Sequence, residues 1–353
     1  MKKSLALSFL FIGTVVGAGF SSGREILTFF SGSLALAPLA VISCGIVFFL
    51  ASNLLLNLAS KIDITDISSL CSHFPQKLQT AIETLLVFFF LTICAMMISG
   101  ADNIFETNST FGISGIILFA LGSVVAMLGN RGLLKVNFLL VPILLCFILF
   151  VSIFHLYKSG LPISDGKNLN YVTSIFEGVS YSSMNLLLSA VVLLSAGKGL
   201  SKREAFISSA ISSVVISVVI LLFLLAMNTS SEFLNAEMPI IPMTARISGF
   251  VRFVSAFAIW IAIFTTFSSS YFTCFEYFKR FCKPPLLRLA ILLAITYPLS
   301  RIGFAPLVSI FMPAMGLFGI VILLLLVNVN SKNKQKKSRE KYKTEDVIVT
   351  PLD

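Results

Sequence analysis

The chain has 353 residues, of which 57% are hydrophobic and only 12% are charged. A soluble domain is nearer half apolar and one quarter charged, so this composition excludes an ordinary water-soluble enzyme or a disordered protein and predicts a protein embedded in lipid. Lysine and arginine (26) exceed aspartate and glutamate (16), giving a net charge of +10, and the placement of this excess describes membrane topology rather than nucleic-acid binding.

Ten apolar runs follow one another along the chain. A helix needs about 20 such residues to cross a hydrocarbon core roughly 30 Å thick, so the pattern predicts an all-α polytopic membrane protein with ten transmembrane helices. The runs cover residues 5–30, 36–59, 78–100, 111–128, 133–157, 172–196, 205–227, 250–278, 286–299 and 304–327. Residues 1–330 then form one transmembrane domain, whose ninth run is short for a crossing.

The basic residues predict the orientation of these spans. Most of them lie in the connections on the same side as the N-terminus, including Lys279 and Arg280 after the eighth run and the lysine-rich tail at 331–353. Cytoplasmic connections retain positive charge, so both termini are predicted to be cytoplasmic in a multi-pass protein of the cell (inner or plasma) membrane. We expect the tail to be a disordered cytoplasmic extension.

Four glycines, Gly13, Gly17, Gly19 and Gly23, lie in the middle of the first run. Each costs a helix interior about 1 kcal/mol relative to alanine, so the helix is predicted to break there. A break at membrane depth is tolerated only where it is buried or lines a wet cavity, and its freed N–H and C=O groups can bind a carboxylate and a small cation. The alternative is that Gly-x-x-x-Gly spacing only permits close helix packing.

The stretch Gly-Thr-Val-Val-Gly-Ala-Gly-Phe-Ser-Ser-Gly-Arg-Glu-Ile at 13–26 resembles the first-helix signature of the YkvI-like amino-acid permeases. These are similar to the amino acid/polyamine/organocation (APC) superfamily, which has the LeuT fold. A weaker resemblance covers Tyr-Ser-Ser-Met-Asn-Leu-Leu-Leu at 181–188. The resemblance implies two inverted five-helix repeats, at about 5–157 and 172–327, with helices 1 and 6 broken around a central site.

Carried over to this sequence, the resemblance implies a substrate site and one sodium site. It places donors for the substrate carboxylate on the backbone of residues 16–19, that is Val16, Gly17, Ala18 and Gly19, with Phe20 beside them. The sodium ligands would be the carbonyls of Gly13 and Val16, completed by hydroxyls of the eighth span from among Thr265, Ser268 and Ser269. Oxygen ligands of this kind suit a hard cation, although interhelical hydrogen bonding explains the same hydroxyls.

Two substitutions relative to this family pattern bear on the coupling ion. Phe20 stands where some sodium-coupled relatives have an asparagine, so at most one Na+ is expected. Proton-coupled relatives can carry a lysine on helix 5, and residues 136–157 contain none. Both observations favour a single Na+.

Polar side chains also interrupt the sixth run. Tyr181, Ser182 and Asn185 predict a second break near residues 180–185, where they could bind the substrate amine or side chain. The alternative is a continuous helix whose hydroxyls bond to their own backbone.

Charged and titratable groups within the runs suggest a gate. An outer gate is predicted in which Arg24 pairs with Glu177 or with the surroundings of Glu25; the alternative is that all three reach the outer surface. His155, near the outer end of the fifth run, has no evident partner, so an interfacial or solvated role is expected.

These patterns together predict a secondary active transporter of a small zwitterionic solute, an amino acid or related amine, working by alternating access with Na+ symport. The chain has no nucleotide-binding or hydrolase motif, so we expect no enzyme activity and no cofactor. The expected partners are the small-molecule substrate and the lipid bilayer, and no nucleic acid. A receptor of the same fold that binds an amino acid without transporting it is the main alternative. A passive channel is a weaker one, because no repeated selectivity ring is evident.

Overall fold

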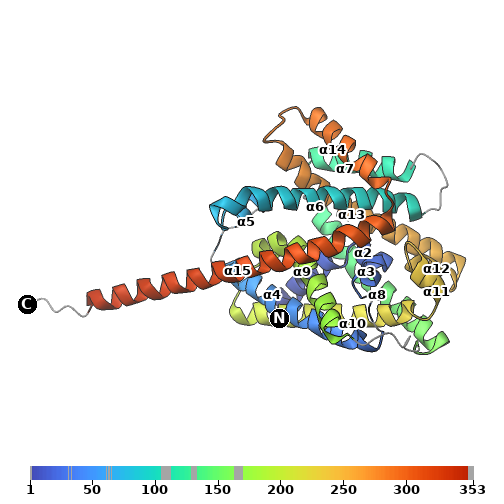
Figure 1. Cartoon of the computed structure of the whole chain (residues 1–353), viewed down its shortest axis with the longest axis horizontal. Helices are drawn as coiled ribbons and strands as arrows, with labels where there is room; N and C mark the ends of the chain where they lie inside the picture. The colour runs from blue at the N-terminus through green and yellow to red at the C-terminus, as the bar shows by residue number, and fades with distance from the viewer. Residues whose placement is uncertain are drawn as a thin grey trace, which may run out of the picture.

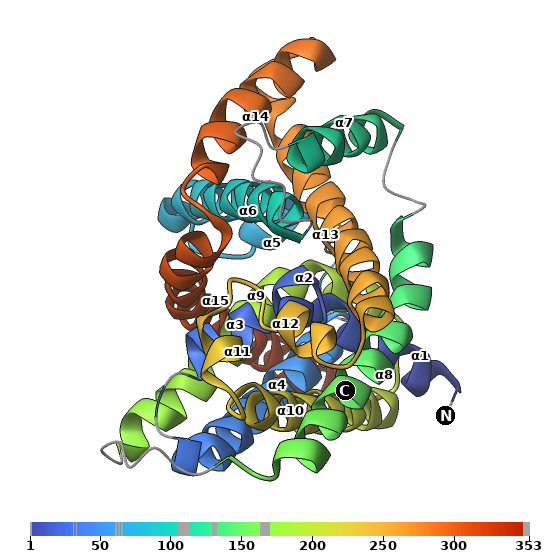
Figure 2. The ribbon, with the colours of Figure 1, turned by 90° about the vertical axis from the view of Figure 1, so that its right-hand side faces the viewer.

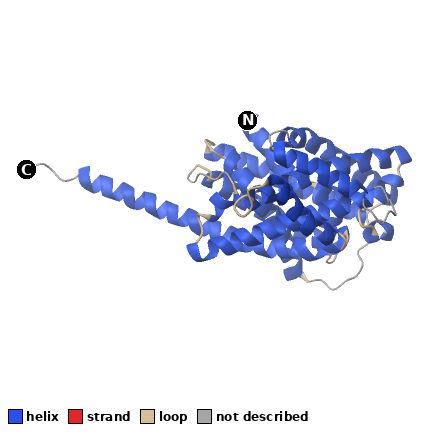
Figure 3. Ribbon diagram, turned by 90° about the horizontal axis from the view of Figure 1, so that it is seen from above, coloured by secondary structure: helices blue, strands red, loops and turns tan. Residues whose placement is uncertain are grey.

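The computed structural model describes residues 2–30, 32, 34–60, 62, 64, 66–104, 113–128, 133–162 and 170–348. All regular structure in these residues is helical, and they contain no strand (Figure 3). The all-α prediction is therefore confirmed over the part of the chain that is described.

The first half of the chain begins with three helical pieces in place of one long helix. They are α1 (Lys2–Val15), α2 (Ala18–Ser22) and α3 (Arg24–Phe29). The chain continues through η1 (Leu34–Leu36), α4 (Ala37–Leu58), α5 (Ile67–Cys71), α6 (Gln76–Ile104), α7 (Ile113–Leu128) and α8 (Leu133–Ser159).

The second half contains four long helices and several shorter ones. They are α9 (Tyr171–Ala196), α10 (Lys202–Met227), α11 (Ser231–Asn235), α12 (Ile240–Ala245), α13 (Gly249–Phe278), α14 (Pro285–Ser300) and α15 (Phe304–Ile348). Several begin at a side-chain cap: the Ser201 hydroxyl accepts from the Glu204 N–H (3.2 Å), and the Glu204 carboxylate accepts from the Ser201 N–H (3.0 Å). This reciprocal pair satisfies N–H groups that the first turn of α10 would leave unpaired.

Seven of the described helices are long and apolar enough to cross a membrane. Three shorter apolar helices, α1, α7 and α14, lie in the first, fourth and ninth predicted runs. The protein is thus built as a multi-pass membrane protein, while the count of ten crossings stays a prediction.

The long helices form two groups that face each other (Figures 1 and 2). In one group α4 packs against α9 and α10, and α1 packs against α10. In the other α6 packs against α13, α7 and α14. Helix α8 contacts both α10 and α13, and α15 contacts both α9 and α6, so these two helices join the groups. The space between the groups is where the site described below lies.

The predicted break in the sixth span is wrong, because α9 runs without interruption from Tyr171 to Ala196. Its polar side chains bond to the helix itself: the Ser182 hydroxyl donates to the Gly178 carbonyl (2.9 Å), and the Asn185 amide donates to the Tyr181 carbonyl (3.2 Å). These bonds satisfy the side chains without freeing any backbone group, so the helix has no reason to open.

Glycines hold α9 close to its neighbours on two sides. A methyl group added at Gly178 would overlap the Ala40 carbonyl of α4, and one added at Gly319 would overlap the Ser183 carbonyl on α9. Gly316 meets Ser180 in the same way. Small residues are what allow helix backbones to approach this closely within a membrane.

Helix α15 continues past the end of the tenth run to Ile348, and it extends away from the bundle as a single rod (Figure 1). The lysine, glutamate and glutamine residues of this segment are good helix formers, so an apolar helix already under way can propagate through them. Residues 349–353 lie outside the described part.

Candidate functional site

The first span is interrupted at Val16 and Gly17. The Gly17 N–H donates to the Val15 carbonyl (2.9 Å) rather than to the carbonyl of Gly13, its helical partner four residues earlier. Gly17 itself is extended, with φ −91° and ψ −166°, and helix resumes at Ala18. The Gly13 carbonyl is thereby released from the helical hydrogen-bond ladder in the middle of an apolar segment.

This interruption opens onto a central cavity of about 770 Å³ between the two helix groups. Its volume lies within the range of roughly 300–1,000 Å³ that is usual for small-molecule sites. The predicted site residues that line it are Gly13, Val16, Gly17, Ala18, Gly19, Glu25, Asn185, Thr265 and Ser269. Those that do not line it are Phe20, Arg24, Glu177, Tyr181, Ser182 and Ser268.

Hydroxyl groups of α13 form the wall opposite the interruption. The Thr265 and Ser269 hydroxyls donate to the carbonyls of Ala262 (3.0 Å) and Thr266 (3.1 Å), so their oxygen lone pairs stay available to a ligand. Thr266 is not among the predicted sodium ligands, yet a methyl group added at Gly17 would lie only 3.3 Å from its Oγ1 atom. Helical spacing could have pointed to it, since Ser269 and Thr273 follow it at three and seven residues on one face.

Glu25 lies inside the site rather than at its outer edge. Its side chain is buried and lines the central cavity. The Asn185 amide on α9 donates to its Oε1 atom (3.3 Å), and a methyl group added at Gly19 would overlap its Oε2 atom. This carboxylate is predicted to serve an outer gate, whereas in the structure it faces the broken segment.

The other two predicted gate residues, Arg24 and Glu177, line a second cavity of about 390 Å³ that shares no lining residue with the first. In the described residues no ion pair joins them, and the Glu177 carboxylate instead accepts from the backbone N–H of Gly32. Their pairing with substrate bound stays a prediction.

Aromatic rings separate the two cavities. Tyr181 contacts Phe29 and Phe30 with ring centroids 5.3 Å apart in each case, and contacts Phe48 at 6.2 Å. From this cluster the central cavity extends along α13 to Arg280, whose side chain is 49% exposed. The central cavity therefore reaches the end of the bundle at which the sequence predicts the cytoplasm.

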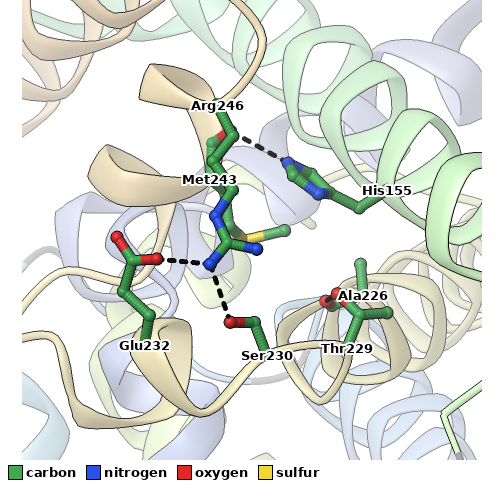
Figure 4. Close-up of polar contacts among 7 residues, drawn as sticks. All are labelled: His155, Ala226, Thr229, Ser230, Glu232, Met243 and Arg246. Carbon is green, nitrogen blue, oxygen red and sulfur yellow. Dashed lines mark hydrogen bonds and ion pairs between the residues drawn. The ribbon is translucent and has the colours of Figure 1, made fainter.

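Helices α11 and α12 lie at the opposite end of the bundle (Figure 1). The Arg246 side chain pairs with Glu232 and donates to the Ser230 hydroxyl (3.1 Å) (Figure 4). It also lies over the Phe233 ring, 4.5 Å from its centroid. His155 is 2% exposed, and its Nε2–H donates to the Met243 carbonyl (2.9 Å). The expectation of an interfacial or solvated histidine is therefore wrong, because the ring is buried and hydrogen-bonded. The sequence did not reveal this partner, since it is a backbone carbonyl rather than a side chain.

Comparisons with known proteins agree with a transporter fold. No protein-family model matches the chain. It is 24% identical over 321 residues to the uncharacterized protein YyaD of Bacillus subtilis, covering 89% of this chain and 93% of that one. It is 25% identical over 329 residues to the uncharacterized membrane protein YkvI of the same organism, covering 90% and 92%.

Two solved structures have a similar architecture. The manganese transporter of Eremococcus coleocola has a TM-score of 0.60 at 16% identity, covering 91% of this chain and 78% of that one. Mhp1, a nucleobase-cation-symport-1 family transporter, has a TM-score of 0.57 at 13% identity, covering 93% and 74%. At such identities the likeness shows the fold alone: the chain is a multi-pass membrane protein with the LeuT-like fold of these transporters.

Proposed function

We propose that this protein is a secondary transporter that carries a small zwitterionic solute, an amino acid or a related amine, across the cell membrane together with Na+. The observation that carries the proposal is the interruption of the first span at Gly17, which opens onto the central cavity between the helix groups. Broken helices at such a position are where transporters of this architecture bind solute and ion. The fold shared with other transporters supports the same conclusion.

The position of the cavity suggests how binding drives a conformational change. The released Gly13 carbonyl belongs to α1, and Thr265, Thr266 and Ser269 belong to α13. An ion held by both touches the two helix groups at once, so its binding energy depends on how the groups sit relative to each other. A ligand shifts a conformational equilibrium only through such a difference in affinity between the states.

Uptake into proteoliposomes tests the proposal. Purified protein is reconstituted and offered a panel of radiolabelled amino acids with an inward gradient of Na+ or of choline. We expect at least one amino acid to accumulate above its external concentration with Na+ only, and a sodium ionophore to abolish the accumulation. Saturable binding without accumulation would instead support the amino-acid receptor. The absence of both binding and uptake for every amino acid tested would contradict the proposal.

A matched pair of variants tests the sodium site. Thr266→Val removes the hydroxyl opposite Gly17 while keeping the shape of the side chain. We expect it to raise the Na+ concentration needed for half-maximal uptake by about tenfold, equivalent to about 1.4 kcal/mol. Thr273→Val, on the same helix and cavity wall but two turns nearer the inner end, should leave it unchanged. Equal effects of both variants would place the ion elsewhere.

A further inference from the structure

Glu25 is a buried carboxylate at the broken end of the central cavity, and its side chain has no cationic partner. It is 5% exposed, and over the described residues no lysine, arginine or histidine forms an ion pair with it. At the inner end of the same cavity, Arg280 pairs with Glu83 (2.9 Å) and Lys279 with Glu276 (3.6 Å). A single acidic group without an ion pair therefore lies beside the break.

The surroundings of Glu25 hold it in place without neutralising it. The Asn185 Nδ2 atom donates to its Oε1 atom (3.3 Å) and also to the Tyr181 carbonyl (3.2 Å). The buried Tyr181 hydroxyl lies beside the carboxylate and has no regular hydrogen-bond partner. On the other side the carboxylate packs against Gly19, where any larger residue would displace it.

An unpaired charge in this position is expensive. Burying a carboxylate without a counter-ion costs several kcal/mol, and ionisable groups inside a membrane protein face a cavity or a ligand pathway. The charge is removed either by a proton on the carboxylate or by a positive group that enters the cavity.

The ligand set decides which cation fits. Divalent metals prefer several carboxylate or histidine ligands, and the described residues contain no group of three or more His, Cys, Asp or Glu that could hold a metal. A primary ammonium group needs only a few acceptors, which one carboxylate and adjacent backbone carbonyls provide. Glu25 and the freed backbone at Gly17 line the same cavity, so one small solute can reach both.

We propose that Glu25 is the binding partner of the substrate's ammonium group, and that the protein selects solutes carrying a protonated amine. This inference rests on the proposed function and narrows its substrate class. The carboxylate end of a zwitterion would lie at the freed backbone, and its amine end at Glu25.

Matched ligands test this inference on the unmodified full-length protein. Thermal stabilisation in detergent with Na+ is measured for each common amino acid and for its 2-hydroxy-acid counterpart, in which only the amine is replaced. We expect one or more amino acids to stabilise the protein. The affinity for the matching hydroxy acid should be about 10- to 100-fold weaker, because a hydrogen bond between charged groups is lost. Equal affinity within a pair would overturn the inference and leave the transport proposal standing.

Variants provide the second arm. Glu25→Gln keeps the size of the side chain and removes its charge, so affinity for the stabilising amino acid should fall by a similar factor, about 10- to 100-fold. Glu25→Asp should retain part of the affinity, and Glu232→Gln, which removes the ion pair between α11 and Arg246, should retain all of it. The Glu25→Gln variant could change only the Na+ requirement and still bind the amino acid more tightly than its hydroxy acid. In that case the carboxylate would belong to the ion site and the inference would fail.

Two further outcomes are decisive. If Glu25→Gln does not fold, the ligand pairs alone decide the question, because they need no variant. If no amino acid stabilises the unmodified protein and none is transported, both the inference and the proposed function are overturned.

Discussion

His155 connects α8 to helices α11 and α12, which cover one end of the bundle. Besides its hydrogen bond to the Met243 carbonyl, its ring packs edge-on against Phe233 with centroids 5.0 Å apart. His155→Ala should destabilise the protein by about 2–4 kcal/mol, because it leaves a buried carbonyl without its donor and a void beside Phe233. The measurement is the thermal midpoint of the protein in detergent.

The other histidine provides the control for this prediction. His73 lies in a short connection, and its ring contacts the Ser69 carbonyl one turn earlier in the same segment (2.8 Å). His73→Ala should therefore change the midpoint very little. Equal losses in the two variants would mean that the contact with Met243 contributes nothing specific.

Individual site residues were predictable where the backbone itself carries the signal. The glycines at 13, 17 and 19 mark the interruption because no ordinary helix tolerates so many. The direction of Glu25 was not predictable, because it depends on Gly23, whose φ of 83° turns the chain between α2 and α3. Arg24 and Glu25 are adjacent in sequence, yet after this turn they line different cavities.

The contact between α9 and α15 depends on the absence of side chains. Gly319→Ala should push α15 away from the Ser183 carbonyl and lower stability by about 1–3 kcal/mol, the usual cost of overfilling a packed interface. Gly249→Ala, at the start of α13, adds a methyl group in open space and should leave the thermal midpoint nearly unchanged. A stable Gly319→Ala variant would show that the two helices separate at little cost.

Whole helices were predictable from the length of their apolar runs, and interruptions only from residues that break a helix. Helix α9 shows the limit: residues 180–185 resemble a binding segment, but this stretch contains neither glycine nor proline, and Ser182 and Asn185 bond to their own helix. The same serine-rich composition therefore fits an open and a closed backbone. Only the packing against α4 and α15 distinguishes them.

The two separate cavities predict which side of the membrane can reach the site. The central cavity extends to the exposed Arg280, while Phe29, Phe30 and Tyr181 close it from the second cavity, which Arg24 and Glu177 line. In a background without Cys146 and Cys282, Ser269→Cys should react with a membrane-impermeant thiol reagent in inside-out vesicles and not in right-side-out vesicles. Ser309→Cys, in the second cavity, should show the reverse.

This labelling experiment also checks the orientation predicted from the basic residues. Reaction of both cysteines from the same side would contradict the separation of the cavities. Reversal of both would leave the separation intact and invert the topology.

The assembly of the molecule could be predicted only in part. Apolar runs and positive charges indicate spans and sides, but they do not say which helices meet, because every span presents a similar apolar surface to lipid and to its neighbours. That α4 packs on α10 and α6 on α13 follows from contacts between residues far apart in sequence. The inverted repeat came from family resemblance rather than from residue identities, and it stays a prediction.

The close fit of α9 between α4 and α15 has a mechanical consequence. Gly178 brings it against α4, and Gly316 and Gly319 bring it against α15, so these three helices should tilt as a single block. The unwound turn around Gly17 is a joint outside this block. If the protein carries a solute as proposed, a crosslink that stiffens this joint should stop the transport cycle, whereas a crosslink within the block should not.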